Sequence, residues 1–441
     1  MKNLIERENS IKFWQENTVG FWNNTKFVLP FAITILLCIA WMNRFVQDDA
    51  FISFRYAENF ANGFGLVWNP GENIEGYTNF LWTVIISLPI YAGFNPVAAS
   101  FAIGIAIFCF SLILCYRISW TIFNSKFIAL LSIVLLGTNY TFSSYATGGL
   151  ETQLQTCLFL TALYQAISSI KNNGWKLSKI LLLSLASALA MLTRLDSAVL
   201  LSTIFAISSL SILKEASSIR TKLIKLSALS IPFLILVGGW LAWKQFYYGD
   251  ILPNTFYAKV SVGTSISIGI EYVSKLFVSY WLVPFPFLLL FSFKKLFSKI
   301  NNYDLQTLLV FPIILWLSYI IKVGGDFMEF RFIVPILPLF FILVSWVITD
   351  VVKTKSIQIA LISLIIFGSF QHWKSFGVFV KAGGIEPISR LQGHLDHWEN
   401  IGKTLKSDLP LNSGVSIAIT PAGAIPYYSG LKSIDMHGLN D

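Results

Sequence analysis

Two adjacent carboxylates, Asp48 and Asp49, follow the first hydrophobic run of the chain, residues 26–42. They open a polar stretch that reads DDAFISFRYAENFANGFGLVWNPGENIEGYTNFLW. Such charges beside a membrane span are often only solvated surface groups. Neighbouring carboxylates can also divide catalytic roles, because their mutual repulsion separates their pKa values. One of them can then accept a proton from a substrate hydroxyl, or the pair can hold a divalent cation. In this apolar chain, the pair predicts a catalytic site that faces water beside the lipid.

The same polar stretch contains residues suited to binding a phosphate or a sugar. Arg55 could grip a phosphate through two parallel hydrogen bonds. Polar and stacking groups typical of sugar pockets are supplied by Glu75, Tyr77 and Asn79. The stretch therefore combines candidate proton acceptors with a candidate phosphate ligand.

Three later polar segments carry further candidates. Arg194 and Asp196 lie between two apolar runs, where they could form a simple ion pair at the membrane surface or contact a substrate. The block YYGDILPNTFYAK contributes Asn254, Tyr257 and Lys259, and the block VGGDFMEFR contributes Asp326 and Arg331. The cations among them are phosphate-binding candidates, and the paired glycines of the second block would let the backbone approach a ligand.

Cysteine and histidine give little support for a metal site. All four cysteines lie in apolar runs, which indicates neither a disulfide framework nor a thiolate site. His394 and His397 have a spacing that could share a metal, but a single pair without further ligands is a weak signal. We therefore predict no dedicated metal site, and a divalent cation only at Asp48 and Asp49.

The composition places these polar segments in a membrane protein. Of the 441 residues, 55% are hydrophobic and 12% are charged, about half the charged fraction of a soluble domain. We expect no nucleic-acid partner, because the net charge of +9 is explained by Lys and Arg in cytoplasmic loops. The chain is therefore predicted to be an all-α polytopic membrane protein.

Eleven runs are long enough, or nearly so, to cross a bilayer. They cover residues 26–42, 97–116, 127–143, 152–170, 178–193, 196–213, 226–243, 278–293, 306–322, 332–350 and 356–372. A shorter run at 80–93 contains a proline and is expected to lie in the interface. With eleven spans and a cytoplasmic N-terminus, the Lys-rich short loops face the cytoplasm.

This topology brings every unusual loop to the outer face. These loops are 43–79, 144–151, 194–196, 247–259 and 323–331, and the segment after the last span joins them. We predict a cytoplasmic lead-in at 1–25, a transmembrane domain at 26–372 with an outer loop at 43–96, and a small periplasmic α/β domain at 373–441. In that last domain a helix precedes the strands VSIAIT and SIDMHG, with the Gly/Pro turn PAGAIPYYSG between them.

Several of these blocks together resemble the GT-C membrane glycosyltransferases, a family that includes mycobacterial terminal arabinofuranosyltransferases and bacterial enzymes acting on pilin or lipopolysaccharide. The blocks are the polar stretch after Asp48, GGLET, LTRLD, YYGDILPNTFYAK, GGDFMEFRFIVPILP and AIPYYSGLKSIDMHGLND. The resemblance covers residues 26–441. It implies a GT-C type fold with juxtamembrane helices in the first outer loop, a polyprenyl-phosphate-sugar donor and a catalytic base at Asp48 or Asp49.

We therefore expect an enzyme of the bacterial inner membrane that transfers a sugar, with D-arabinofuranose favoured, to a periplasmic glycan or a pilin hydroxyl. Arg55, Lys259 and Arg331 would stabilise the leaving phosphate. The alternative is a flippase or another transporter of a lipid-linked sugar. A transporter should show charges buried in the middle of spans and two pseudo-repeated halves, whereas here the charges lie at span ends.

Overall fold

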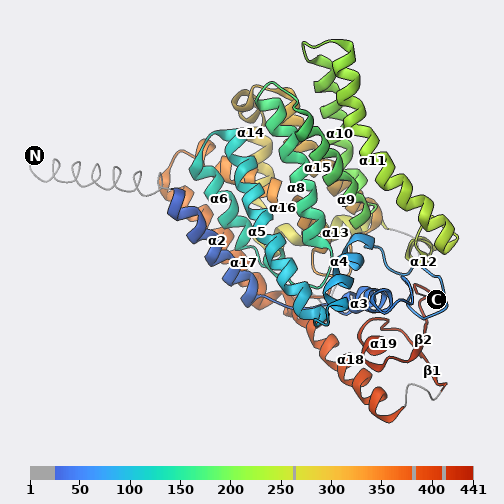
Figure 1. Ribbon diagram of the computed structural model, residues 1–441. Helices are drawn as coiled ribbons and strands as arrows, with labels where there is room; N and C mark the ends of the chain where they lie inside the picture. The colour runs from blue at the N-terminus through green and yellow to red at the C-terminus, as the bar shows by residue number, and fades with distance from the viewer. Residues whose placement is uncertain (1–24, 262–264, 380–383, 410–413, 441) are drawn as a thin grey trace, which may run out of the picture.

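The computed structural model describes residues 25–261, 265–379, 384–409 and 414–440 and consists mostly of helices (Figure 1). The predicted lead-in at 1–25 lies outside the described residues, apart from Thr25. The helices up to residue 261 are α2 Thr25–Met42, α3 Asp48–Ala61, α4 Phe80–Tyr91, α5 Pro96–Phe123, α6 Lys126–Gly137, α7 Tyr140–Ser144, α8 Thr152–Lys171, α9 Leu177–Thr193, α10 Ser197–Lys214, α11 Ile219–Tyr248 and α12 Asn254–Ser261. The remaining elements are α13 Ile266–Ser279, α14 Pro284–Ile300, α15 Tyr303–Val323, η1 Arg331–Ile336, α16 Leu337–Trp346, η2 Val347–Val351, α17 Lys355–Phe379, α18 Ile388–Asp408, β1 Ser416–Ile419, α19 Ala424–Ser429 and β2 Lys432–Asp435.

The apolar helices make this a multi-pass membrane protein. Within the described residues, six helical segments are long and apolar enough to span a bilayer, or seven if the bent pair α13 and α14 forms one span. Every hydrophobic run predicted from the sequence contains a helix, although α2, α6 and α9 are shorter apolar helices in the described part of the chain. The count of eleven spans and the boundaries of the transmembrane domain stay predictions.

A sharp bend lies near the start of the predicted run at 278–293. Helix α13 ends at Ser279, α14 begins at Pro284, and the two axes differ by 96°. Trp281 has a left-handed backbone conformation at the bend, with φ at 56°. Proline is favoured at the first position of the following helix. The apolar composition continues through the turn, which is why the sequence pattern did not reveal it.

Helix α4 lies within residues 80–93, and the expectation that they do not cross the membrane stays a prediction. It has 12 residues and is therefore about 18 Å long, whereas a bilayer core is about 30 Å thick. It packs against α3, α5 and α9. Because α3 and α4 are connected by the polar stretch of the first loop, this packing joins that loop to the helix bundle.

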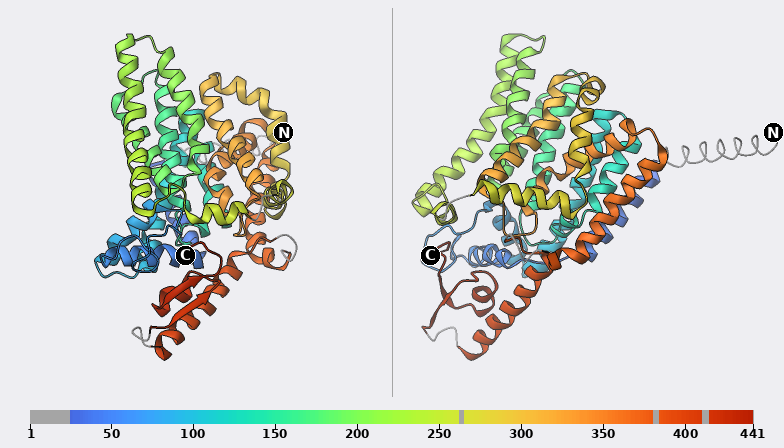
Figure 2. Two further views of the ribbon diagram at one scale, coloured as in Figure 1. Left: turned by 90° about the vertical axis from the view of Figure 1, so that its right-hand side faces the viewer. Right: turned by 180° about the vertical axis from the view of Figure 1, so that it is seen from behind.

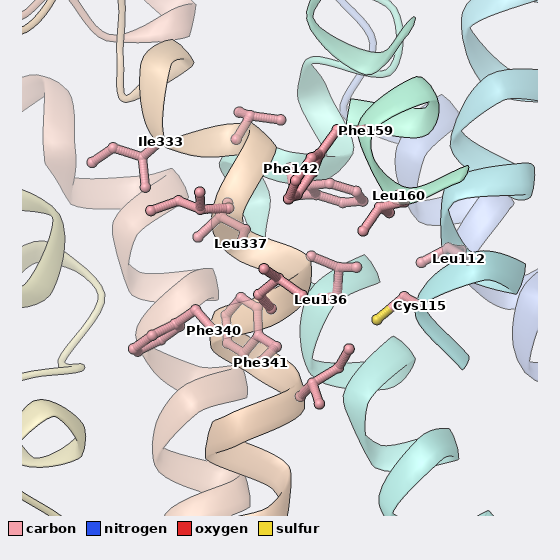
Figure 3. Close-up of a cluster of buried hydrophobic side chains, with 14 of the residues drawn as sticks. Leu112, Cys115, Leu136, Phe142, Phe159, Leu160, Ile333, Leu337, Phe340 and Phe341 are labelled. Atoms are coloured by element: carbon pink, nitrogen blue, oxygen red, sulfur yellow. The ribbon is translucent and has the colours of Figure 1, made fainter. Parts of the chain in front are cut away.

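The centre of the bundle is the segment formed by η1, α16 and η2. Within its apolar window 89% of the residues are buried, the largest share among the candidate spans. Leu337 and Phe341 face apolar side chains from α5, α6, α7 and α8, whereas Phe340 points the other way and packs against Phe277 of α13 (Figure 3). Such close packing holds the start of the segment, Arg331, in a fixed position.

The loops that the topology prediction placed on one side do gather at one end of the bundle (Figures 1 and 2). The backbone N–H of Gln47 donates to the carbonyl oxygen of Gly148 at 3.2 Å, and that of Asn254 donates to the carbonyl oxygen of Glu75 at 2.9 Å. The backbone N–H of Phe45 also donates to the hydroxyl of Thr147. These contacts connect three loops that lie far apart in the sequence.

Residues 384–409 and 414–440, which we call the tail, form the predicted α/β segment at this same end (Figure 2). Strands β1 and β2 are parallel, with Ser416 opposite Lys432 and Ile419 opposite Asp435. The predicted Gly/Pro turn between them is wrong, because it contains the helix α19. Parallel strands need a crossover connection, and a helix commonly provides it.

The close contact between Gly104 of α5 and the loop before α8 provides a test of how the helix bundle is packed. A Cβ atom on Gly104 would lie 2.0 Å from the carbonyl oxygen of Ala146, in the loop before α8. We expect Gly104→Ala to lower the stability by roughly 1–3 kcal/mol, the usual cost of overpacking. Thermal unfolding of the purified protein in detergent measures this.

Gly239→Ala is the matched control, since Gly239 lies in α11 with nothing within 4 Å of an added Cβ. There the substitution should be neutral or stabilising, because alanine has the higher helix propensity. Equal melting temperatures for the two variants would contradict the close contact at Gly104.

Candidate active site

The acidic pair begins the helix α3 and its two carboxylates have different surroundings. Asp48 is only 5% exposed, and its Oδ1 accepts a hydrogen bond from the backbone N–H of Ala424 at 2.7 Å. The tail backbone passes so close that a Cβ on Gly423 would lie 2.1 Å from the carbonyl oxygen of Asp48. Burial, together with the neighbouring charge of Asp49, raises the pKa of Asp48 to about 7, although the Ala424 amide lowers it. The tail therefore covers Asp48.

Asp49 is the more accessible carboxylate of the pair. Its side chain is half-buried, and consecutive residues of a helix point about 100° apart. Its backbone N–H is held by the side chain of Gln47, the N-cap of α3. Arg331 lies within electrostatic reach of Asp49. Of the two acids, Asp49 is thus the one whose negative charge acts on Arg331.

An ion-pair network centred on Arg194 lies next to this pair. Its guanidinium contacts Glu151 at 2.7 Å and Asp196 at 2.6 Å. Burial disfavours a charged Glu151, but Arg194 and Arg331 nevertheless keep the pKa of this carboxyl below its usual value. The second oxygen of Glu151 accepts from the side-chain amide of Asn79 at 2.8 Å. The network therefore connects the loop at 194–196 to the end of the first polar loop.

Arg331 is a second cation in the same place. Asp326 accepts its Nε–H at 2.7 Å, and no other hydrogen-bond partner of Arg331 is found among the described residues. The guanidinium carbons of Arg194 and Arg331 lie 5.3 and 5.2 Å from the centre of the Phe332 ring. The terminal N–H groups of Arg331 are thus available to an anion.

A small cavity opens between these groups. Its lining residues are Glu151, Thr152, Gln155, Arg194, Trp316, Arg331 and Phe332. Two cations and an aromatic ring in its lining are groups that attract an anion such as a phosphate. Asp49, the accessible carboxylate, is not among the lining residues. Of the residues predicted from the sequence, this site brings together Asp49, Asn79, Arg194, Asp196, Asp326 and Arg331.

Arg55 lies apart from this cavity and bonds to protein acceptors, and its predicted role as a phosphate ligand stays a prediction. Its Nε donates to the carbonyl of Trp68, and its terminal nitrogens donate to Asn69 and to the carbonyls of Pro426 and Leu431. Burial lowers the pKa of Arg55 to about 10. With four donors used by protein acceptors, Arg55 holds the tail.

Glu75 and Tyr77 lie in a separate buried cluster. Glu75 forms an ion pair with Lys244 of α11 at 2.7 Å, and burial raises the pKa of Glu75 to about 7, although Lys244 lowers it. The hydroxyl of Tyr77 lies 3.1 Å from that of Tyr248, and its ring packs edge-on against Tyr56. These contacts fix the first polar loop against α11.

The candidates from the fourth loop lie in α12 and the segment before it. The backbone of Asn254 contacts Glu75, as described above, while the hydroxyl of Tyr257 donates to Asp250 at 2.9 Å on the exposed surface. Lys259 lies in α12, but its side chain is outside the described residues. Its predicted contact with a phosphate therefore stays a prediction.

Sequence reasoning missed three buried charged positions: Glu151, Lys244 and Glu329. Each is buried and joins two segments. Glu151 lies inside the block GGLET, while Lys244 and Glu329 are single charges in apolar or aromatic surroundings. An ionisable residue in such a position is itself a signal, because it needs a partner.

Solved structures resemble this arrangement of helices. ArnT from Cupriavidus metallidurans bound to undecaprenyl phosphate matches with a TM-score of 0.65 and 11% identity, covering 93% of this chain and 86% of that chain. The oligosaccharyltransferase AglB from Archaeoglobus fulgidus, in complex with an inhibitory peptide and a dolichol-phosphate, matches with a TM-score of 0.55 and 11% identity. That match covers 93% of this chain and 64% of AglB. The chain has a GT-C fold.

The expected resemblance to GT-C glycosyltransferases is thereby confirmed. The terminal beta-(1->2)-arabinofuranosyltransferase of Corynebacterium glutamicum is 26% identical over 398 residues. That alignment covers 82% of this chain but only 54% of the relative, so the chain spans about half the length of this enzyme. Residues 388–441, which include most of the tail, match a family model described as a domain of unknown function, DUF8728.

The raised pKa of Asp48 predicts a pH-dependent contribution to stability within this GT-C fold. Because burial raises it from 3.8 to about 7, the folded state binds more protons than the unfolded state between these values. The free energy of unfolding therefore falls as the pH rises through this window. In Asp48→Asn this fall in the free energy of unfolding, of the order of a few kcal/mol, should be absent, because asparagine does not titrate. Its amide oxygen can still accept the hydrogen bond from the N–H of Ala424.

Melting temperatures in detergent between pH 5 and pH 8 measure this effect. Asp408→Asn, at an exposed aspartate of α18, is the control and should follow the parent protein. An Asp48→Asn variant with the same pH slope as the parent would rule out this origin of the dependence.

Proposed function

We propose that the protein transfers a sugar from a polyprenyl-phosphate donor to an acceptor hydroxyl, with Asp49 as the general base and Arg331 as the main phosphate ligand. The proposal is supported by the accessible carboxylate of Asp49, whose charge acts on Arg331, and by the terminal N–H groups of Arg331, which are open to an anion. The GT-C fold, shared with a protein whose structure holds undecaprenyl phosphate, supports it.

In the proposed reaction the acceptor oxygen attacks the anomeric carbon of the sugar. The bond between that carbon and the phosphate oxygen breaks, and polyprenyl phosphate leaves. Asp49 takes the hydroxyl proton as the new glycosidic bond forms. The leaving phosphate gains negative charge, which Arg331 and Arg194 stabilise at the cavity.

We assign the base to Asp49 because Asp48 is covered by the tail. An acceptor hydroxyl must approach the base within hydrogen-bond distance, about 2.6–3.2 Å. Gly423 and Ala424 occupy that position at Asp48. Asp48 therefore has a structural role in this proposal.

A divalent cation shared by Asp48 and Asp49 fits this arrangement poorly. One oxygen of Asp48 already accepts the amide of Ala424. Among the described residues, no three or more His, Cys, Asp or Glu side chains are grouped to hold a metal ion. No step of the proposed reaction passes through a metal.

For the sugar we propose D-arabinofuranose, supported by the similarity to the arabinofuranosyltransferase of Corynebacterium glutamicum. The acceptor would be a glycan or a pilin hydroxyl. We further propose that the protein lies in the bacterial inner membrane with eleven spans and this site facing the periplasm. The gathering of the distinctive loops at one end of the bundle supports a single site on one side.

The first prediction from this function concerns the two acids. We expect Asp49→Asn to reduce transfer from decaprenyl-phosphate arabinose by about 10²–10⁴-fold, the usual contribution of a general base. The identical substitution next to it, Asp48→Asn, is the matched control and should keep most of the rate. Initial rates of the purified proteins measure both. Normal transfer by Asp49→Asn would eliminate it as the base.

The second prediction concerns the phosphate ligand. Arg331→Gln should reduce kcat/KM for the donor by about 10²–10³-fold, because one preorganised charge on the leaving group is lost. Arg44→Gln is the control, since Arg44 is exposed and donates to the carbonyl of Trp41 in the same outer segment. Equal donor kinetics in these two variants would remove Arg331 from the site.

A further inference from the structure

In each of the two tail helices, α18 and α19, the first backbone N–H donates to a carboxylate of the membrane part. The backbone N–H of Ile388, the first residue of α18, donates to Oε2 of Glu329 at 2.8 Å. The backbone N–H of Ala424, the first residue of α19, donates to Oδ1 of Asp48. The first amides of a helix lack helical partners and carry partial positive charge, so a carboxylate there stabilises the helix end. Glu329 and Asp48 thus fix where the two helices begin.

The far end of α19 is held as well. Arg55 donates to the carbonyl of Pro426 at 2.6 Å and to that of Leu431 at 2.9 Å. Asp48 and Arg55 both belong to α3 and are both buried. One helix of the membrane part therefore holds the start and the end of α19 through opposite charges.

Helix α18 connects the same acidic segment to the loop that carries Arg331. The side chain of Gln392 accepts the backbone N–H of Val46, two residues before Asp48, at 3.1 Å. At the start of the tail, the N–H of Glu386 donates to Phe327 at 2.7 Å, and the N–H of Glu329 donates to Glu386 at 3.1 Å. The tail therefore bonds to both elements that contribute to the site.

Glu329 occupies the central position in the loop at 324–331, which we call the arginine loop. Its side chain is 1% exposed, and its Oε1 lies 2.9 Å from Nε2 of His372 and 3.3 Å from the hydroxyl of Thr141. Phe330, the residue between Glu329 and Arg331, has a left-handed backbone with φ at 44°. The left-handed region allows only a narrow range of backbone angles. A displacement of Glu329 should therefore change the direction of Arg331, only one residue further along the chain.

We propose that the tail is a bracket that fixes the start of α3 and the arginine loop relative to each other, with Glu329 as the positioning residue for Arg331. This gives the DUF8728 segment a role in forming the site itself. The bracket proposal rests on the proposed function in one respect, namely that Arg331 is a phosphate ligand.

Hydrogen exchange tests the bracket without any substrate. Glu329→Ala should accelerate amide exchange at least tenfold at 388–391 and also at 46–50, which the tail connects to Glu329. In the reverse direction, Gln392→Ala removes a bond between the tail and the segment before α3. It should accelerate exchange at 326–332, in the arginine loop. Glu271→Ala, at a half-exposed glutamate of α13 that pairs with Lys275, is the control and should change neither region. Acceleration confined to 388–391 in the first variant would overturn the bracket.

Binding of undecaprenyl phosphate tests the positioning of Arg331. We expect Glu329→Ala to raise the Kd of this lipid at least tenfold and Glu329→Gln to restore most of the affinity, because an amide oxygen can still accept from Ile388. An unchanged Kd in Glu329→Ala, despite faster exchange at 46–50, would overturn the role of Glu329. A loss of affinity in Glu329→Gln as large as that in the alanine variant would also overturn it.

The bracket and the proposed function can fail separately. If the parent protein does not bind undecaprenyl phosphate, the proposed donor is wrong, and the exchange results still decide whether the bracket exists. If it binds the lipid and Glu329→Ala exchanges like the parent at 46–50 and 388–391, the bracket is wrong and the proposed function stands. Glu329→Gln also guards against general unfolding, because it keeps the buried shape of the side chain.

Discussion

Two guanidinium groups lie beside one phenyl ring at the end of an apolar bundle, and the rest of the site depends on neutralising them. Arg194 and Arg331 repel each other, and burial adds a desolvation cost to both. Glu151, Asp196 and Asp326 supply the compensating charge. Because these carboxylates come from different segments, the requirement for charge balance also fixes where those segments lie.

Uncharged side chains connect these ion pairs to α3, the helix that begins with Asp48 and Asp49. Asn79 accepts the hydroxyl of Ser53 in α3 and donates to Glu151. A shift of α3 would therefore leave a buried amide or carboxylate without its partner, which costs more than the bond itself contributes. Packing supports the same arrangement, since Arg331 begins the most buried segment of the bundle. The site is thus held by polar bonds at its surface and by close packing beneath it.

The sequence predicted the parts of this structure that depend on local composition. Long apolar runs predicted helices, and one helix signal followed by two strand signals predicted the α/β character of the tail. It could not separate Arg55 from Arg331, because both are arginines in distinctive polar blocks. Their difference lies in partners far away in the chain: Arg55 bonds to carbonyls more than 370 residues later, while Arg331 keeps terminal donors open. The bend before Pro284 was missed for a similar reason, since composition records apolarity and not direction.

The contact between Asp48 and Ala424 joins residues 376 positions apart. Asp48 is synthesised together with the first span. The residues that cover it, Gly423 and Ala424, follow the other membrane helices of the described chain. During synthesis the acidic helix must therefore remain solvated while most of the chain is still being inserted. Contacts of such high sequence separation form late, because the entropy of closing the intervening chain must be overcome first. The order of synthesis thus makes completion of the site depend on the insertion of the helices before it.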